Sequence, residues 1–422
     1  MHRSARGSAW DAAQAVGPAR VMAVEAGTQP QALAGVRVLE LDGHATGYAG
    51  RLLSDLGADV ICVEPPGGDA GRTLPPFAAG AGGEPVSLHH AYVAAGKRAV
   101  TLDLATAEGQ EQFLRLVDTA DVCLEGGAPG AMEAIGLDRD RLTGRNAGLV
   151  LVSVTPFGQV GPHARYLGGD LVALATGGLL HLGGYHDAGP VAVYGRQSHF
   201  IGSIVAAVAA LLGILAVRRG TAGRHLDVSV QEGVTLALED SLAEYELNGR
   251  VRRRLGGRPR EAGSGTYPCR DGYVTMVAGR LSTGRSWRAL VEWLVEEDAD
   301  DAGRLLGPEW DDFQHRGEPE SIATFERIFC AFAAARSKAD LYHAGQRRSI
   351  AIAPVNSIED VVGDAQLLAR GAFEDVPGAG LGRAARFPAP PYRLSLTPAR
   401  IGGAAPRVGE HNTEVLGQEV AG

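Results

Sequence analysis

Three histidines and one aspartate occur close together in the chain and could bind a metal ion by residue type. They are His181, His186, Asp187 and His199. Imidazole nitrogens and carboxylate oxygens are common zinc ligands, and known sites place them at a few recurring separations. Here the histidines are five and thirteen residues apart, which fits no familiar ligand pattern. The sequence therefore predicts no metal, and Asp187, which precedes Ala188-Gly189-Pro190, is open to interpretation as a turn aspartate.

Common cofactor and nucleophile motifs are missing. The first strand-like segment, Gly35–Asp42, is followed by Gly43–Gly47 (GHATG) and not by GxGxxG, so NAD is weakly supported. No GxxxxGK(S/T) loop and no GxSxG elbow occur in the chain, which disfavours a P-loop nucleotide site and a serine hydrolase.

Composition narrows the class of protein further. The formal net charge is -9, which argues against a general nucleic-acid binder. The main basic cluster is Arg250–Arg254 with Arg258 and Arg260, and it reads as a solvated surface loop. Four scattered cysteines form no CxxC pair, so we expect neither disulfides nor zinc, and a reducing cytoplasm.

The elements that must position these residues alternate between strands and helices. Strand patterns cover Gly35–Asp42, Asp59–Glu64, Ala99–Leu104, Asp121–Glu125 and Gly148–Thr155, with helical patterns at Tyr48–Leu56, Thr106–Asp118 and Met132–Leu142 between them. Such alternation predicts βαβ units and a parallel sheet. The fold class is therefore α/β.

One apolar segment raises the question of a membrane. Phe200–Val217 has 18 residues without a charge, which is a marginal length for a membrane span. It is rich in alanine and lies between soluble-looking elements, so we expect a fully buried core helix and no membrane association. The first 32 residues show no apolar signal segment and read as a disordered extension.

The order of several motifs resembles one family, the family III CoA-transferases of the carnitine and bile-acid type. The similar segments include LAGVRVLEL, RLLSDLGADVICVEPPGGD, GKRAVTLDL, VSVTPFGQVGP, GYHDAGP, TYPCRDGYV, APVNSIEDVVGDAQLLARG, PAPPYRLS and GEHNTEVL. They run in the same order from about residue 33 to residue 416, which is nearly the whole chain. Each segment is weak by itself, but nine in one order are specific.

The resemblance implies a domain plan and an assembly. A Rossmann-like large domain is built from both ends of the chain, at residues 33–248 and 346–422, with a smaller α+β domain at residues 249–345. It also implies an interlocked homodimer. The substrates would be a carboxylic acid and its CoA thioester, with coenzyme A as the group transferred and neither metal nor NAD required.

The resemblance also assigns roles to residues. An aspartate before a Gly-Pro pair attacks the acyl-CoA thioester in such transferases, and Asp187 matches it. An anhydride and then an aspartyl-CoA thioester would form. His44 lies near a loop residue that faces the thioester, although it is a lone histidine in a turn. The segment Gly263-Ser264-Gly265 lies where the family often has an active-site loop, so it is either a lid or a plain linker.

Several CoA contacts of the family are altered here. Gly126 and Gly127 stand where an Asn-Phe pair is common, Ala134 replaces an arginine, and Pro65 replaces a basic residue. The remaining basic candidates for the CoA phosphates are Lys97, Arg98 and Arg72, and a structural surface role is open for them.

Two alternatives to transfer remain open. Asp170, in Leu167–Leu171 (LGGDL), matches the base of the related α-methylacyl-CoA racemases, but Leu137–Thr143 lacks the histidine that would be its partner. A structural or capping aspartate is then the simpler interpretation of Asp170. The altered CoA contacts also fit a non-catalytic or repurposed subunit of a hetero-oligomer.

Overall fold

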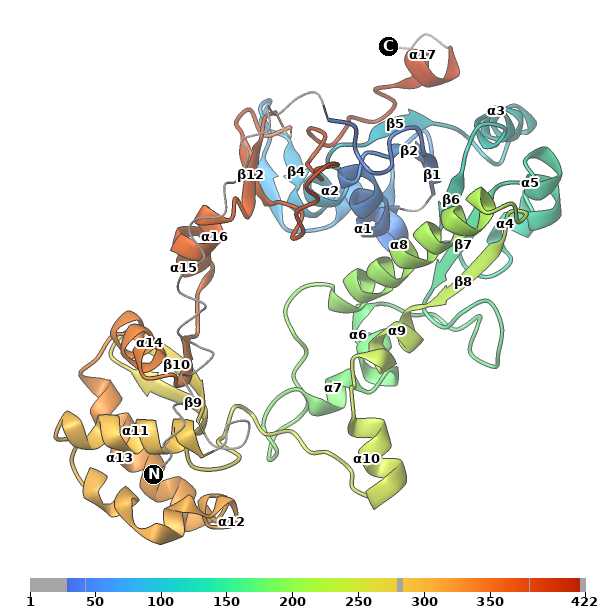
Figure 1. Ribbon diagram of the computed structural model, residues 1–422. Coiled ribbons are helices and arrows are strands. Elements are labelled where there is room, and N and C mark those ends of the chain that lie inside the picture. The colour runs from blue at the N-terminus through green and yellow to red at the C-terminus, as the bar shows by residue number, and fades with distance from the viewer. Residues whose placement is uncertain (1–28, 42, 279–283, 379, 418–422) are drawn as a thin grey trace, which may run out of the picture.

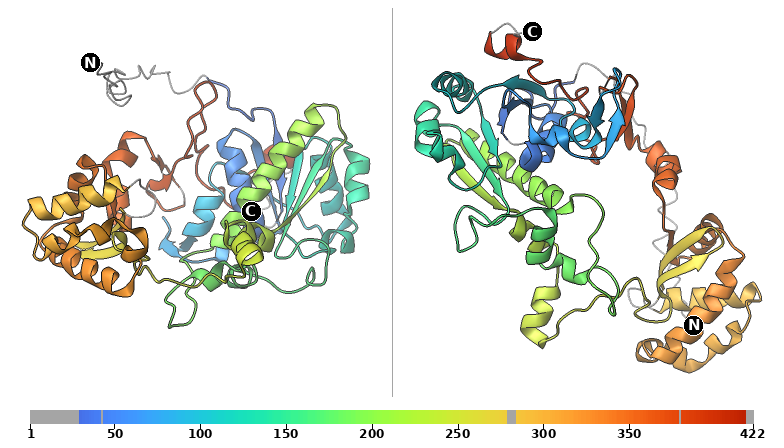
Figure 2. Two further views of the ribbon diagram at one scale, coloured as in Figure 1. Left: turned by 60° about the horizontal axis from the view of Figure 1, so that its bottom comes forward. Right: turned by 180° about the vertical axis from the view of Figure 1, so that it is seen from behind.

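Two lobes joined by two chain segments make up the molecule. The computed structural model describes residues 29–41, 43–278, 284–378 and 380–417. The large lobe holds most of the chain, and the small lobe, drawn in yellow and orange, lies apart from it in every view (Figures 1 and 2). Residues 1–28 of the predicted N-terminal extension lie outside the described residues.

A six-stranded parallel sheet forms the centre of the large lobe. Its order is β5-β2-β1-β6-β7-β8. The strands are β1 (Arg37–Glu40), β2 (Asp59–Glu64), β5 (Arg98–Thr101), β6 (Val122–Glu125), β7 (Val150–Thr155) and β8 (His225–Ser229). Nearly every residue of β2, β6 and β7 is buried, as expected for parallel strands covered on both faces. The predicted α/β class is confirmed.

Helices cover both faces of this sheet because their apolar sides match it. On one face, α1 (Gly43–Asp55) and α8 (Gln197–Arg218) pack against β1, β6 and β7. On the other, α3 (Ala107–Val117) and α5 (Arg139–Arg145) bury Phe113, Leu116 and Leu142 against the strands. The strand order reverses between β1 and β6, and ligands of open α/β sheets bind at the carboxyl ends beside such a reversal.

The helix α8 is only half buried, so the expectation of a fully buried core helix is wrong. Its small residues approach the sheet closely, and a Cβ added at Gly213 would lie 2.5 Å from the Val150 side chain. By length and composition alone α8 could cross a membrane, but 39% of its apolar window is buried in the protein. The opposite side is exposed along four apolar residues, namely Ile204, Val208, Leu212 and Leu215.

The small lobe has its own sheet and core. Strands β9 (Ser264–Cys269), β10 (Gly272–Val277) and β11 (Ala351–Pro354) form an antiparallel sheet in the order β11-β10-β9. Helices α11 (Arg285–Glu296), α13 (Pro319–Ala334) and α14 (Lys338–Arg347) surround a core that includes Trp287, Phe325 and Phe329. Since β11 pairs with β10, the sheet of this lobe extends past the boundary predicted at residue 345.

The C-terminal part then returns to the large lobe. The hairpin β12 (Phe373–Val376) and β13 (Ala385–Pro388) packs Val376 and Phe387 against α2 (Leu88–Val93). Beyond it, α17 (Asn412–Leu416) lies beside β5, where the His411 amide donates to the Ala99 carbonyl at 3.0 Å. Both chain ends therefore contribute to the lobe, although all six strands of its main sheet come from residues 37–229.

The remaining elements are short and mostly connect these parts. They are η2 (Ala70–Thr73), β3 (Phe77–Ala79), β4 (Pro85–Ser87), α4 (Ala131–Ala134), α6 (Asp170–Thr176), α7 (Leu179–Leu182), α9 (Val230–Leu236), α10 (Ser241–Asn248), η3 (Ala302–Leu306), η4 (Pro308–Asp311), α12 (Phe313–Arg316), α15 (Ile358–Gly363) and α16 (Ala365–Ala369). Of these, α15 and α16 lie on the segment that connects the small lobe to β12, as Figure 1 shows.

Candidate active site

Asp187 lies on an exposed loop between α7 and α8. The loop closes at its base, where the Val191 amide donates to the Gly183 carbonyl at 3.1 Å. The Asp187 side chain is 60% exposed, and its carboxylate lies 3.5 Å from His186 Nδ1 and 3.9 Å from Arg258 Nη2. In this single chain the carboxylate is accessible and hydrated.

One arginine holds this loop in place. The Arg254 guanidinium donates to the carbonyls of His181, Tyr185 and Ala188 at 3.0, 3.1 and 3.2 Å. The Tyr185 ring lies so close to Gly256 that a Cβ there would be 2.2 Å from it. The segment that leads to the small lobe is therefore attached to the loop that carries Asp187. The cluster predicted as a solvated surface loop includes this positioning arginine.

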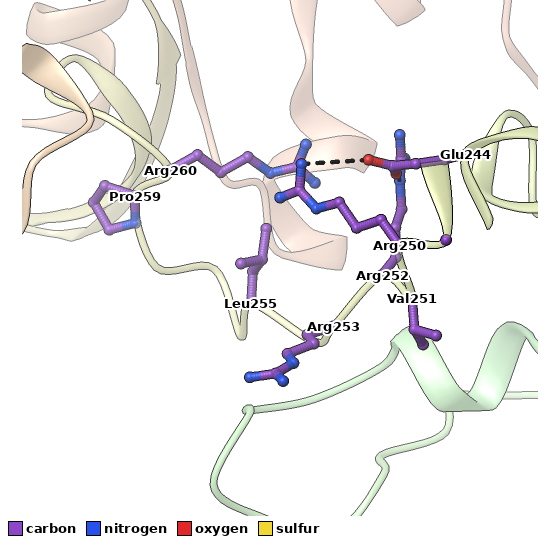
Figure 3. Close-up of a pocket in the computed structure, with 9 residues that line it drawn as sticks. Glu244, Arg250, Val251, Arg252, Arg253, Leu255, Pro259 and Arg260 are labelled. Carbon is purple, nitrogen blue, oxygen red and sulfur yellow. Dashed lines mark hydrogen bonds and ion pairs between the residues drawn. The ribbon is translucent and has the colours of Figure 1, made fainter. Parts of the chain in front are cut away.

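An arginine-rich cavity is lined by residues 244–260, which include part of the connecting segment (Figure 3). It has a volume of about 930 Å³ and lies between α10 and the connecting segment. Glu244 neutralises part of its charge, because it pairs with Arg252 at 2.6 Å and Arg250 at 3.4 Å. A neighbouring cavity of about 480 Å³ shares Arg253 and Arg260 and reaches Tyr185. An anionic group placed beside Asp187 would meet this positive surface.

A second group of polar residues gathers beside the carboxyl end of β1. His44 is the second residue of α1, and its ring meets the ring of His199 from α8 edge-on, with centroids 4.8 Å apart. Burial, and then the charge of Arg196, lowers the pKa of His44. The same causes lower the pKa of His89, from α2, to about 4. For His199, burial and then His44 lower the pKa to about 4.

Asp170 is tied to the start of α8. It is the first residue of α6, and its carboxylate accepts hydrogen bonds from the Ser198 amide and hydroxyl, both at 2.8 Å. This arrangement joins the starts of two helices. The interpretation as a structural or capping aspartate matches these contacts.

The basic residues proposed for CoA are engaged inside the protein. The buried Lys97 ammonium donates to both Glu40 oxygens and to the Gly47 carbonyl, at 2.7 to 2.8 Å, so its three hydrogens are used. Arg72 makes a two-pronged pair with Glu64 at 2.6 and 2.7 Å. Arg98 likewise pairs with Asp59. All three contacts stabilise the lobe, and they leave these cations few free N–H groups with which to bind a phosphate.

The glycine candidates lie in two different places. Gly126 and Gly127 follow β6 at the carboxyl edge of the sheet, where the Gly127 amide donates to Glu125 at 3.0 Å. Gly263 packs on Trp287 in the small lobe, and Ser264 and Gly265 begin β9. The segment Gly263–Gly265 is therefore the start of a strand and not a free loop.

The site residues thus form separate groups. Among the described residues, no hydrogen bond or ion pair joins Asp187 to His44, Asp170 or Lys97. The sequence interpretation missed His89, Arg196 and Arg254 as site residues, and weighed His199 only as a metal ligand. The spacing of residues in the sequence could not have indicated that His89 and His199 belong to one group, because they come from helices more than a hundred residues apart.

Comparison with known proteins defines the class to which this architecture belongs. A crystal structure of a CAIB/BAIF family protein from Brucella suis superimposes with a TM-score of 0.80 at 26% identity, and covers 92% of this chain and 99% of that one. The model of CoA-transferase family III matches residues 33–412. The chain belongs to CoA-transferase family III and is a CoA-transferase by this relationship.

Named relatives are similar over nearly their full length. Succinyl-CoA:(R)-benzylsuccinate CoA-transferase subunit BbsE of Thauera aromatica is 36% identical, over 90% of this chain and 92% of that protein. Succinate–glutarate CoA-transferase of Agrobacterium fabrum is 31% identical, over 92% and 95%. Succinyl-CoA–L-malate CoA-transferase alpha subunit of Chloroflexus aurantiacus is 29% identical, over 92% and 89%.

Proposed function

We propose that this chain is a subunit of an enzyme that moves CoA from succinyl-CoA, or a similar acyl-CoA, to a carboxylic acid acceptor in the cytoplasm. Relatives named for succinyl-CoA or succinate support the substrate class. The observation that carries the proposal is the position of Asp187, a carboxylate on a loop fixed by Arg254 beside an arginine-lined cavity.

In the proposed reaction, Asp187 is the nucleophile. Its carboxylate oxygen attacks the acyl carbonyl carbon, the C–O bond forms as the C–S bond breaks, and CoA leaves as a thiolate. The thiolate attacks the aspartyl carbonyl of the anhydride, which releases the first acid and leaves an aspartyl-CoA thioester. The acceptor carboxylate then attacks this thioester, and the freed thiolate attacks the acceptor carbonyl of the second anhydride. The new acyl-CoA departs and Asp187 is restored.

Exposure of Asp187 leads us to propose that a second chain completes the site. An anhydride on a hydrated loop would be hydrolysed, so the transfer requires water to be excluded. Two named relatives are subunits. The exposed apolar side of α8 gives a second chain a surface to cover. A homodimer or a hetero-oligomer meets this need equally, and assembly with a different chain is the stronger expectation given the subunit names.

The first experiment is intact-protein mass spectrometry with succinyl-CoA, on the chain alone and on the chain co-produced with a second family III chain. We expect an acyl- or CoA-sized adduct on Asp187 that hydroxylamine removes and Asp187→Ala lacks. Asp170→Asn is the control that keeps the shape of the side chain and should retain the adduct. An adduct on the other chain of a complex would move the nucleophile there and leave this chain as the non-catalytic subunit.

A racemase or isomerase reaction through Asp170 gains no support from the geometry. Its carboxylate accepts two hydrogen bonds from Ser198, and proton abstraction would have to break them. Deuterium exchange beside the thioester carbonyl, without any acceptor acid, would revive this function.

A further inference from the structure

A cluster of nitrogen donors without acceptors lies at the start of α8. We call the residues Arg196, His199, His44 and His89 the donor cluster. Arg196 precedes the first residue of α8, and His44 and His199 touch through their rings. Buried nitrogen atoms of three of them, Arg196 Nη1, His44 Nδ1 and His199 Nδ1, have no hydrogen-bond partner within the described structure. Buried polar atoms are rarely left unpaired, so such a group indicates a missing partner.

The charges around the donor cluster favour an anion as that partner. Arg196 is cationic at all relevant pH values, whereas burial and neighbouring positive charge keep the three histidines neutral near pH 7, because they lower each histidine pKa. Asp69 and Asp170 are the acidic groups that act on these histidines. Asp69 already accepts from the Gly43 and Gly71 amides, and Asp170 accepts from Ser198. Neither carboxylate neutralises the free Arg196 nitrogen.

Two other partners fit less well. Three histidines suggest a metal ion, but no group of three or more His, Cys, Asp or Glu residues in the described ranges is arranged to hold one. A phosphate dianion would need more than the one fixed cation present. One guanidinium with neutral imidazole donors instead matches the single charge and the several lone pairs of a carboxylate.

We propose that the donor cluster binds a carboxylate of the acid substrate, through Arg196 with His44, His89 and His199 as neutral donors. The inference rests on the proposed function, in which every substrate carries a carboxylate. Two sources share this chemistry, namely the free acid and the distal carboxylate of a dicarboxylic CoA thioester. The cluster lies beside the carboxyl end of β1, where the strand order reverses, which is the usual ligand position in such a sheet.

The experiment measures binding and not turnover, so it is independent of Asp187. Succinate, succinyl-CoA and butyryl-CoA are titrated calorimetrically into purified protein that carries Asp187→Ala, with and without a change at Arg196, in the assembly in which it is isolated. We expect Arg196→Gln to lower the binding affinity for succinate, or for succinyl-CoA, about tenfold, and Arg196→Lys to recover part of this affinity. If the variant loses affinity for succinyl-CoA but not for butyryl-CoA, the bound group is the distal carboxylate of the thioester. Loss for succinate with both thioesters unchanged assigns the free acid.

Proton uptake gives a readout that a structural role of the cluster would not move. A bound carboxylate favours protonated histidines, so succinate binding at about pH 5.5 should take up protons, seen as different heats in buffers of different ionisation enthalpy. His199→Gln should reduce this uptake. His225→Gln is the matched control, because His225 is a partly buried histidine on β8 whose pKa is also lowered by burial.

The outcomes separate this inference from the proposed function. Equal weakening of all three ligands by Arg196→Gln, or no change with any of them while thermal unfolding is normal, would overturn the carboxylate site. If Asp187→Ala binds succinate as the wild type does but no adduct forms in any variant, the carboxylate site stands and the nucleophile is wrong.

Discussion

The Asp187 loop and the donor cluster differ in nearly every physical respect. Asp187 is an exposed carboxylate on a loop whose carbonyls accept three hydrogen bonds from Arg254. The donor cluster is partly buried, and its histidines are neutral near pH 7 beside a single cation. The two proposals together assign the covalent step to the exposed loop and recognition to the partly buried helix starts.

The largest expected effect, and the strongest test of this comparison, comes from substituting the two aspartates, Asp187 and Asp170. With a complete assembly and saturating succinyl-CoA, we expect Asp187→Ala to lower kcat at least about 1000-fold, because a nucleophile has no substitute. Asp170→Asn should change kcat by less than about tenfold, since the amide oxygen of the substituted side chain can still accept from Ser198. Steady-state kinetics measure both. A reversed order would place the chemistry at the start of α8.

The support given by Arg254 should have the next largest effect. Arg254→Ala removes three hydrogen bonds to the loop, so we expect a loss of about 10 to 100-fold in kcat/KM and faster chymotrypsin cleavage after Tyr185. Arg253→Ala is the matched control, because Arg253 is the neighbouring arginine and lines both cavities, and among the described residues it makes no hydrogen bond to the loop carbonyls. Equal effects of the two variants would make bulk positive charge, and not loop position, the role of the cluster.

Acid should destabilise the protein through its buried histidines, among them two members of the donor cluster. Folding lowers the pKa of His89 and His199 to about 4 and of His90 to about 3, in each case mainly through burial. The unfolded chain therefore binds more protons between about pH 6.5 and pH 4, so stability falls as the pH drops through that window. We expect Tm to fall by about 5 °C between about pH 7 and pH 5. His199→Gln should make this fall shallower, as differential scanning calorimetry would reveal.

The smallest expected effect concerns the anchor of α8. Ser198→Ala removes the hydroxyl hydrogen bond to Asp170 but keeps the amide bond, so we expect a loss of about 1 kcal/mol in the free energy of unfolding. Urea denaturation measures it, with Ser241→Ala as the control, since the Ser241 side chain lies at an uncapped helix start. A loss of several kcal/mol would mean that Asp170 and the donor cluster act as one unit.

The periodic parts of the fold were predictable because local pattern determines them. Buried strands such as Val150–Thr155 are mostly apolar runs, and α3 begins at Ala107, just after Thr106, in agreement with the helical pattern at Thr106–Asp118. The half-exposed α8 was not predictable, since an alanine-rich helix is apolar on all sides and only packing shows which side is covered. The pairing of β11 with β10 also depends on contacts between residues far apart in sequence.

The candidate sites likewise include residues that local sequence motifs indicate and residues that only long-range contacts indicate. Asp187 and Asp170 were found because short motifs surround them. The burial of Lys97 against Glu40 is a long-range contact, which charge alone cannot distinguish from a phosphate ligand. The donor cluster draws one histidine from each of three helices and Arg196 from the residue before α8, and its interpretation depends on which atoms lack hydrogen-bond partners, which only the structure shows.

The attachment of the Asp187 loop to Arg254 has a mechanical consequence. Arg254 belongs to one of the two segments that connect the lobes, and Figure 2 shows that these segments join the small lobe to the large lobe. Any rotation of the small lobe about its connections pulls on the guanidinium and therefore on the loop. The distance between the lobes and the orientation of the Asp187 carboxylate are then coupled, so a partner chain that fixes the first also fixes the second.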